Sequence, residues 1–197
     1  MQVMVIIRNF AFTYPMFYAK TIQRLMERHK IMTRRATVGD LPGIKELFRR
    51  AVAGVDNKYY NNEEKADWAA CADKPGHWEQ LVDTCFFIVA TSADGRITGF
   101  AAINGNGLLE LMYVDRTCKR QGIGSAMLYE LEDYARGKGL KEIRADVSYA
   151  AEGFLKNKGY VVLKKQERKA VNMVMGNLLM MKRLVAGNGH ADRREQD

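Results

Sequence analysis

The sequence contains few of the residues that define disulfide-bonded, metal-binding or membrane-spanning proteins. Among its 197 residues are only 3 Cys, 3 His and 3 Pro. Cys71, Cys85 and Cys118 are odd in number and match neither a zinc motif nor a disulfide framework. No stretch reaches the ~18 consecutive apolar residues of a membrane span. These absences predict a cytoplasmic protein with reduced thiols, without a metal and without a membrane partner.

The remaining composition is typical of one globular domain with an excess of basic residues. Hydrophobic residues make up 47% and charged residues 27% of the chain, which excludes disordered and fibrous proteins. The net charge of +8 and the cluster Lys164–Lys169 suit a nucleic-acid-binding module. However, that cluster alternates along a strand end without interleaved aromatic residues, as a solvated strand does. We therefore predict no nucleic-acid partner and keep that module as a rival hypothesis.

The N-terminal segment differs from the rest of the chain. Residues 1–31 hold five basic residues against one acidic residue and show no strand alternation, so we interpret them as an extension outside the folded domain. The rival interpretation is a helix that lies on a membrane surface. Features of a folded domain begin at Met32, because the strand-like run 34–38 is followed by Asp40 and Pro42, which predict a helix start. We expect three parts: an extension over 1–31, a domain over 32–183 and a flexible tail over 184–197.

Hydrophobic periodicity predicts both helices and strands in the domain. An amphipathic helix is expected through Ile44, Leu47, Phe48 and Val52. Further helices are expected over 62–72, 76–84, 122–137 and 150–158. Strands are expected over 34–38, 86–91, 97–103, 108–114, 140–147, 160–165 and 171–181. This order predicts a single α/β (α+β) domain whose mixed central sheet of six to seven strands is mostly antiparallel and flanked by helices.

The loop after residue 114 combines basic residues with two glycines at a helix start. Lys119 and Arg120 precede Gly122 and Gly124, so backbone N–H groups lie uncovered and the helix dipole favours an anion. A Walker loop needs Lys after the second glycine, and a dinucleotide fingerprint needs Gly or Ala where Met127 stands. The loop therefore predicts a site for a phosphate-bearing ligand. The alternative is a glycine-rich helix start beside a solvated basic loop.

Two motifs resemble the GNAT (Gcn5-related N-acetyltransferase) superfamily. The run Lys119–Gly124 is similar to its Arg/Gln-x-x-Gly-x-Gly/Ala signature, with Lys at the Arg/Gln position and Arg116 in place of a usual Pro. The run Phe154–Tyr160 is similar to its second signature, Phe-Tyr-x-x-x-Gly-Phe. The resemblance covers residues 32–183 and implies a sheet that is splayed at a cofactor cleft.

Further residues resemble the YafP-type branch of that superfamily. They are Tyr60-Asn61, Trp68-Ala69, Gly159-Tyr160, Lys165–Arg168, Asn177 and Met180. The branch implies the same fold and indicates no particular acceptor.

The resemblance implies that the protein transfers an acetyl group from acetyl-CoA, its cosubstrate, to the primary amine of a small molecule by direct attack on the thioester. The implied cofactor-binding residues are Met112, Tyr113, Val114, Lys119, Arg120, Gln121, Gly122, Ile123, Gly124, Ser125, Ser148 and Phe154. Two alternatives stay open: an acyl-CoA-binding regulatory module without turnover, and a peptide or protein N-acetyltransferase. The oligomeric state is also open, with a homodimer as one candidate.

Glu110 is the candidate base for the amine proton. Strand alternation predicts that it shares a face with Met112 and Val114, whereas residues 109, 111 and 113 point to the other face. An acid in a Leu/Met strand indicates a cavity or a partner. The alternative is an exposed or salt-bridged strand glutamate.

The acid for the leaving thiolate is where this sequence departs from its relatives. Leu155 stands where many members of the superfamily have Tyr, and leucine has no proton to give. Ser148, Tyr149 and Tyr160 are candidates to replace it, although they also suit a helix cap, a surface residue and a half-buried residue respectively. A thiolate that leaves unprotonated or through water is the remaining alternative.

Tyr60, Trp68 and Asn177 are candidates for the acceptor wall, because the resemblance places helices before the first central strand at that wall. Aromatic residues at the first two positions are also typical of a core. His77 has no His or Cys at ligand spacing, which argues against a metal.

Overall fold

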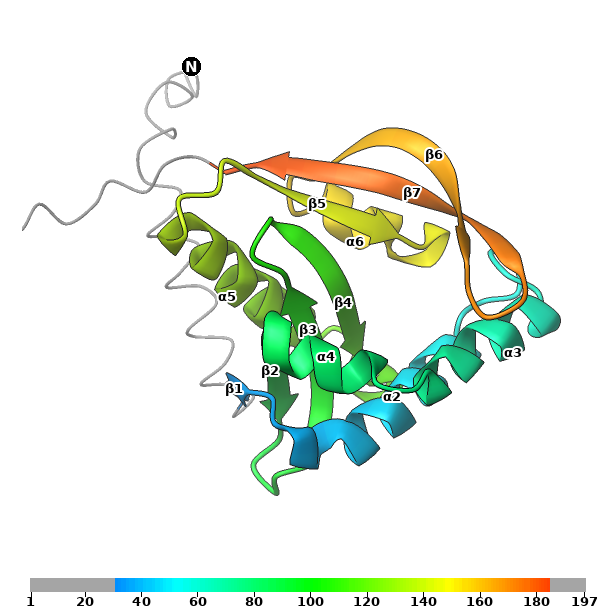
Figure 1. The fold of residues 1–197 in the computed structure, drawn as a ribbon, viewed down its shortest axis with the longest axis horizontal. Coiled ribbons are helices and arrows are strands. Elements are labelled where there is room, and N and C mark those ends of the chain that lie inside the picture. The colour runs from blue at the N-terminus through cyan, green and yellow to red at the C-terminus, as the bar shows by residue number, and fades with distance from the viewer. Residues whose placement is uncertain (1–30, 185–197) are drawn as a thin grey trace, which may run out of the picture.

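The structure, a computed structural model, describes residues 31–184 (Figure 1). Its strands are β1 (Met32–Arg35), β2 (Phe86–Thr91), β3 (Ile97–Ile103), β4 (Leu108–Val114), β5 (Glu142–Val147), β6 (Val161–Lys169) and β7 (Val174–Arg183). Its α-helices are α2 (Leu41–Ala53), α3 (Asn62–Ala69), α4 (His77–Thr84), α5 (Ile123–Gly137) and α6 (Glu152–Lys156). Short 3-10 turns are η1 (Val38–Asp40), η2 (Ala70–Asp73), η3 (Arg116–Cys118) and η4 (Tyr149–Ala151).

The strands of the described chain form one open sheet in the order β1-β2-β3-β4-β5-β7-β6. Neighbouring strands are antiparallel except β4 and β5, which are parallel. The central strands β2 and β3 are nearly continuous apolar runs because both of their faces are covered. The predicted α/β fold, with one mostly antiparallel sheet flanked by helices, is confirmed.

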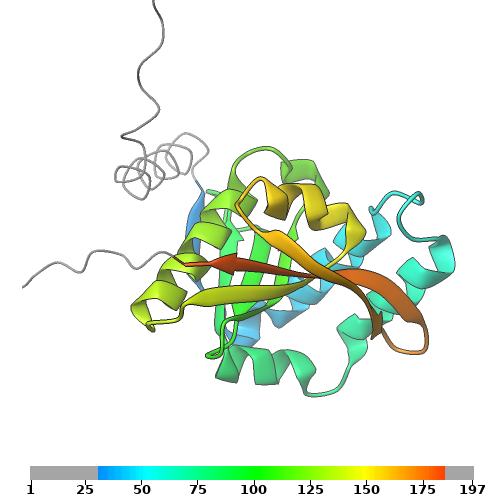
Figure 2. The same ribbon diagram turned by 90° about the horizontal axis from the view of Figure 1, so that it is seen from above.

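Helices cover both faces of the sheet (Figures 1 and 2). On one face, α5 and α6 bury a core that includes Met127 and Leu155. On the other face, α2 and α4 bury a second core that includes Leu47 and Trp78. The apolar stripe predicted for the first helix is buried throughout, at Ile44, Leu47, Phe48 and Val52.

Strands β4 and β5 separate soon after they pair. Their register covers only Leu108 with Arg144 and Leu109 with Ala145. Figure 1 shows the two strands diverging toward their C-terminal ends. The edge of β4 beyond Leu109 therefore has no strand partner on the β5 side, which is the splayed sheet that the resemblance implied.

The predicted boundaries agree with the structure in the meander and differ in the first strand and the last two strands. The strand predicted over 160–165 continues to Lys169, and the strand predicted over 171–181 begins at Val174. The three strands of the meander, β2, β3 and β4, have the predicted limits. The first strand covers residues 32–35 instead of 34–38, because residues 38–40 form a 3-10 turn. Asp40 does not cap α2 with its side chain. Instead its carboxylate accepts hydrogen bonds from the backbone N–H and the hydroxyl of Thr37 and pairs with Arg34.

The ends of the described chain pack into the domain. Ile31 and Leu184 are both buried in the core on the α5 side, and the Leu184 N–H donates to the carbonyl of Lys141. The remainder of the predicted extension and tail lies outside the described residues. The division at residues 32 and 183 therefore stays a prediction.

The turn between β6 and β7 is attached to the helical layer. The carboxylate of Asp67 in α3 accepts backbone N–H bonds from Val171, Asn172 and Met173 at 2.9–3.0 Å. Lys74, after η2, donates from Nζ to the carbonyl of Ala170 at 2.9 Å. These bonds hold the hairpin turn against α3 and η2, across the gap between β4 and β5.

Candidate active site

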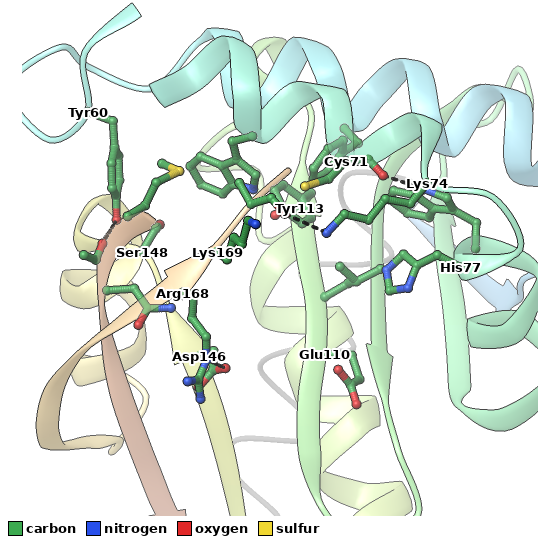
Figure 3. A pocket seen from close by; sticks show the side chains of 18 residues that line it. Tyr60, Cys71, Lys74, His77, Glu110, Tyr113, Asp146, Ser148, Arg168 and Lys169 are labelled. Carbon is green, nitrogen blue, oxygen red and sulfur yellow. Dashed lines mark hydrogen bonds and ion pairs between the residues drawn. The ribbon is translucent and has the colours of Figure 1, made fainter. Parts of the chain in front are cut away.

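A cavity of about 250 Å³ lies where β4 has separated from β5 (Figure 3). Its walls come from α2, α3, η2 and α4 on one side and from strands β4 to β7 on the other. Six residues predicted for the site line it together: Tyr60, Trp68, Glu110, Tyr113, Ser148 and Asn177. They come from five separate parts of the chain, so the tertiary fold brings them together.

Aromatic rings form the wall nearest the helices. The Trp68 ring lies 5.6 Å from that of Tyr60 and 6.4 Å from that of Tyr113, measured between centroids. Burial raises the pKa of Tyr113, so its hydroxyl stays protonated. Tyr60 is 3% exposed, and its hydroxyl donates to the carbonyl of Gly176 and accepts from the N–H of Tyr149. Tyr60 is therefore a buried residue that also lines the cavity.

Asn177 of β7 adds an unsatisfied polar atom to this cavity. Its side-chain amide oxygen is buried and has no hydrogen-bond partner among the described residues. A buried acceptor without a partner costs about 1–3 kcal/mol, so such groups call for a ligand or a water. This oxygen suits a donor group on a bound molecule.

Glu110 faces the cavity because β4 contains a β-bulge. Ile103 of β3 pairs with Leu109, and Ala102 pairs with Leu111, which leaves Glu110 as the extra residue. The predicted alternation is therefore wrong at this point, since Glu110 opens on the side of Leu111 and Tyr113. Met112, Val114 and Leu109 instead pack against the core under α5 and α6.

The Glu110 carboxylate is exposed and positioned by a neutral partner. Asn104, in the turn before β4, donates from Nδ2 to Glu110 Oε1 at 2.8 Å. Of the predicted alternative, an exposed or salt-bridged strand glutamate, the exposure agrees with the structure, and the hydrogen-bond partner is an amide and not a charged group. A carboxylate held in this way at a cavity wall is able to accept a proton.

The hydroxyl candidates for the leaving-group acid lie in different environments. Ser148 lines the cavity, and although it precedes η4, its side chain makes no capping hydrogen bond. Tyr149 stacks on Tyr60 with a centroid distance of 5.9 Å and is not among the cavity residues. Tyr160 and Leu155 are buried in the core on the α5 side. Of the three hydroxyls, Ser148 is the one at the cavity.

The segment predicted as the anion cradle lies between β4 and α5. Gly122 precedes α5 with φ 89°, and no side chain caps the helix there. Because the first turn of a helix has no internal acceptor for its N–H groups, those of residues 122–125 are available to an anion. Lys119 and Arg120 are exposed beside them, and Arg120 also has a positive φ of 62°.

Packing behind the cradle leaves room for little more than a glycine. A Cβ built on Gly124 would lie 3.3 Å from the Phe154 ring and 3.5 Å from Met112 Cε. The Ile123 side chain is buried in the core, so this residue offers only its backbone to a ligand. The loop itself is held by Asp115, which accepts from the Thr117 N–H and pairs with Arg50 at 3.0 Å. Gln121 and Ser125 are half-buried at the same helix start.

Several charged residues of the cavity were not predicted from the sequence. Lys74, His77, Asp146, Arg168 and Lys169 all line it. The Arg168 guanidinium donates to the Asp146 carboxylate from Nε at 2.7 Å, so these two charges offset each other. The basic cluster was interpreted as a solvated strand, but the β6–β7 turn is attached to α3 and the end of this strand lines the cavity.

Comparison with known families identifies the chain. Residues 57–177 match the family described as acetyltransferase (GNAT) domain, which is more than half of the sequence. The chain belongs to the GNAT family. The matched range begins just before Tyr60 and ends at Asn177, so it includes the cradle and every cavity residue except Phe48.

Individual relatives of this GNAT domain agree with the assignment. An uncharacterized N-acetyltransferase of Methanocaldococcus jannaschii is 27% identical over 179 residues, which cover 84% of this chain and 72% of the relative. A GCN5-related N-acetyltransferase of Rhodopseudomonas palustris has a similar fold, with a TM-score of 0.74, 22% identity, and coverage of 78% of this chain and 95% of that one.

A third relative was solved with a ligand. The PaiA N-acetyltransferase of Thermoplasma acidophilum, in complex with coenzyme A, has a TM-score of 0.64 and 19% identity, and the similarity covers 78% of this chain and 98% of that one. These solved structures support the fold of the GNAT domain.

Other kinds of site are lacking in the described part of the GNAT domain. Residues 31–184 contain no group of three or more His, Cys, Asp or Glu side chains arranged to hold a metal ion. Within the same residues, no helix has the length and apolar character needed to cross a membrane.

His77 is expected to make the stability of the GNAT domain depend on pH. Burial, with a smaller contribution from Lys74, lowers its pKa from 6.5. Between that lowered value and about 6.5, the unfolded chain binds more protons than the folded chain, so stability falls as the pH drops below about 6.5. Urea unfolding at about pH 7.5 and about pH 5.5 measures this effect. The free energy of unfolding is expected to fall less between the two pH values for His77→Gln than for the wild type. Equal losses would refute this role.

Proposed function

We propose that this GNAT domain is an acetyl-CoA-dependent N-acetyltransferase that acetylates the primary amine of a small molecule. The separation of β4 from β5 carries the proposal. It leaves one strand running from a cavity with a carboxylate at Glu110 to an anion cradle that begins after Val114. The coenzyme A complex of the similar PaiA N-acetyltransferase supports the same choice of cosubstrate.

The residues around the cradle fit the polar parts of acetyl-CoA. We assign the phosphates to the backbone N–H groups of residues 122–125, with Lys119 and Arg120 adding positive charge. The unpaired edge of β4 at residues 112–114 suits the amide groups of the pantetheine arm. When bound, acetyl-CoA supplies a thioester carbonyl that is open to attack by an amine.

Residues of the cavity account for the proton transfers. Glu110 takes a proton from the attacking amine, directly or through a water, as the new C–N bond forms. Ser148 is assigned as the hydroxyl that relays a proton to the thiolate when the C–S bond breaks, because it lines the cavity and caps no helix. A water returns the proton to Ser148, and Glu110 releases its own proton to solvent. The backbone N–H of Tyr149 donates to the hydroxyl of Tyr60, so Tyr149 positions Tyr60 and has no direct part in the reaction.

A small acceptor fits better than a protein segment. The cavity has a volume of about 250 Å³ and is crossed by the β6–β7 turn, which Asp67 and Lys74 hold in place. Tyr60, Trp68 and Asn177 form its acceptor wall. An acyl-CoA-binding regulatory module without turnover is the second candidate, and it is favoured by the buried, aprotic Leu155.

Four narrower statements remain predictions. They are membership of the YafP-type branch, a cytoplasmic location, a homodimer, and the division of the chain into the parts 1–31, 32–183 and 184–197. None of them enters the mechanism proposed for the cavity.

Release of free thiol from acetyl-CoA, measured against a panel of amines, tests the proposed function. Turnover with at least one amine supports an acetyltransferase. Tight binding of acetyl-CoA without thiol release against any amine would support the regulatory module. Absence of acetyl-CoA binding would contradict both.

Asp67→Ala is expected to raise the KM for the acceptor severalfold and to leave the Kd for acetyl-CoA unchanged. The substitution removes the acceptor of the N–H bonds from Val171, Asn172 and Met173, which hold the turn over the cavity. The cradle residues 119–125 do not line the cavity that this turn covers. Steady-state kinetics and calorimetric titration of acetyl-CoA measure the two constants. A parallel loss of acetyl-CoA affinity would contradict a local role.

A further inference from the structure

The cavity separates its charges along its length. Glu110 provides a carboxylate at the bulge of β4. Figure 3 shows Lys74 and Lys169 beside Tyr113, further along the strand from Glu110. One end of the cavity is therefore acidic and the other basic.

The basic end is not neutralised by the protein. Arg168 and Asp146 pair with each other, and Gln166 donates a further bond to Asp146 at 2.6 Å. His77 has a lowered pKa and is uncharged near neutral pH. Among the described residues, no carboxylate lies within ion-pair distance of Lys74 or Lys169. The charges of the cavity that no other described side chain offsets are therefore the carboxylate of Glu110 and the ammonium groups of Lys74 and Lys169.

Lys74 retains donors for a ligand. Its Nζ donates to the Ala170 carbonyl at 2.9 Å, and an ammonium group has three N–H donors. Lys169 follows Arg168 on β6 and is exposed at the cavity wall. A half-buried ammonium without a counter-charge is stabilised when an anionic group binds beside it.

From this arrangement we propose that the acceptor is a primary amine that also carries an anionic group, such as an amino carboxylate. Its amine lies at Glu110, its anionic group lies at Lys74 and Lys169, and its apolar part extends along β4 between Glu110 and Tyr113. The inference rests on the proposed function and specifies its substrate class. A diamine or polyamine is disfavoured, because its second ammonium would meet the two lysines.

Acceptors of equal length that differ only at one end test the proposal. Pentylamine, 5-aminopentanoate and pentane-1,5-diamine present a methyl, a carboxylate and an ammonium at that end. The kcat/KM for thiol release from acetyl-CoA is expected to be about tenfold or more higher for the carboxylate, because hydrogen bonds to charged groups contribute about 1.5–3 kcal/mol. An equal or higher value for the uncharged amine or the diamine would overturn the proposal.

Variants of the full chain assign the preference to the lysines. Lys169→Met and Lys74→Met are each expected to reduce the ratio of kcat/KM for 5-aminopentanoate to that for pentylamine. Lys169→Glu is expected to make pentane-1,5-diamine the preferred acceptor. Lys164→Met is the matched control, since Lys164 is exposed on the same strand but does not line the cavity. Lys74 also holds the β6–β7 turn, so the exposed Lys169 provides the decisive variant. An unchanged preference in Lys169→Met and Lys169→Glu would refute the assignment.

A binding measurement separates this inference from the proposed function. Both tryptophans of the chain, Trp68 and Trp78, line the cavity, so their fluorescence reports on its occupation. In the presence of coenzyme A, 5-aminopentanoate is expected to bind more tightly than pentylamine even where no thiol is released. Tighter binding without turnover against any amine refutes the acetyltransferase and supports the charge preference. Turnover without that preference supports the acetyltransferase and refutes the inference.

Discussion

Glu110→Gln is expected to lower kcat/KM for the acceptor by about a hundredfold or more and to leave the Kd for acetyl-CoA unchanged, because general base catalysis contributes about 10²–10⁴-fold. The amide has nearly the same shape as the carboxylate and accepts no proton. Since the Glu110 side chain is exposed and bonds only to Asn104 among its described contacts, the substitution removes the base with little change in packing.

A second glutamate controls for the change in charge. Glu167 lies exposed on β6 and does not line the cavity, so Glu167→Gln is expected to keep full activity. Thiol release under saturating acetyl-CoA, together with calorimetric titration of acetyl-CoA, separates the chemical step from cofactor binding. Undiminished turnover in Glu110→Gln would remove Glu110 as the base and direct attention to His77, the neutral nitrogen base of the same cavity.

Gly122→Val is expected to weaken acetyl-CoA binding about a hundredfold. Gly122 has φ 89°, a left-handed conformation that costs a residue with a Cβ about 1–2 kcal/mol. Valine relieves that strain by moving the backbone, and the N–H groups of the following turn then leave the position that suits the phosphates. Each charge-assisted hydrogen bond that is lost contributes about 1.5–3 kcal/mol, so one or two lost bonds account for the expected factor.

Gly95 offers a matched control for the backbone strain. It lies in the turn between β2 and β3 with φ 82°, and a Cβ there would meet nothing within 4 Å. Gly95→Val is therefore expected to lower the free energy of unfolding by a similar amount while acetyl-CoA binds normally. Calorimetry and urea unfolding of both variants measure the two effects. An unchanged affinity for acetyl-CoA in Gly122→Val would contradict the cradle. An equal loss of acetyl-CoA affinity in Gly95→Val would contradict it as well.

The anion cradle is built from residues that are close in the sequence, whereas the cavity is built from residues that are far apart in it. The cradle is local, because Gly122, Gly124 and the start of α5 lie within a few residues of one another, and it forms wherever that helix begins. The cavity is not local, since its residues extend from Phe48 to Asn177. For that reason the sequence indicated a phosphate ligand directly, whereas the acceptor wall came from the family resemblance.

The bulge at Glu110 shows where reasoning from sequence fails. Alternation assigns each strand residue to a face by counting in twos, and one extra residue reverses every assignment beyond it. Here the count is correct from Leu111 to Val114, and it fails at Glu110 and Leu109. The bulge depends on how β4 pairs with β3, which no pattern within β4 records.

The basic residues of the cavity give a similar lesson. Lys169 lies at the end of a strand whose charges resemble an ordinary solvated edge, and Lys74 lies in a short connection after η2. The turn between β6 and β7, whose N–H groups donate to Asp67 and whose Ala170 carbonyl accepts from Lys74, helps bring these distant segments together. The charge pattern that specifies the acceptor class is therefore a property of the folded hairpin.

The sequence by itself determined the α/β class, the limits of the meander strands and the position of the candidate cradle, because periodicity and glycine placement act over a few residues. The tertiary structure alone decided the face of Glu110, the choice of Ser148 over Tyr149 at the cavity, and the basic end formed by Lys74 and Lys169. Those features depend on strand register and on contacts between residues about a hundred positions apart. Such contacts arise from packing the whole chain and leave no local signal.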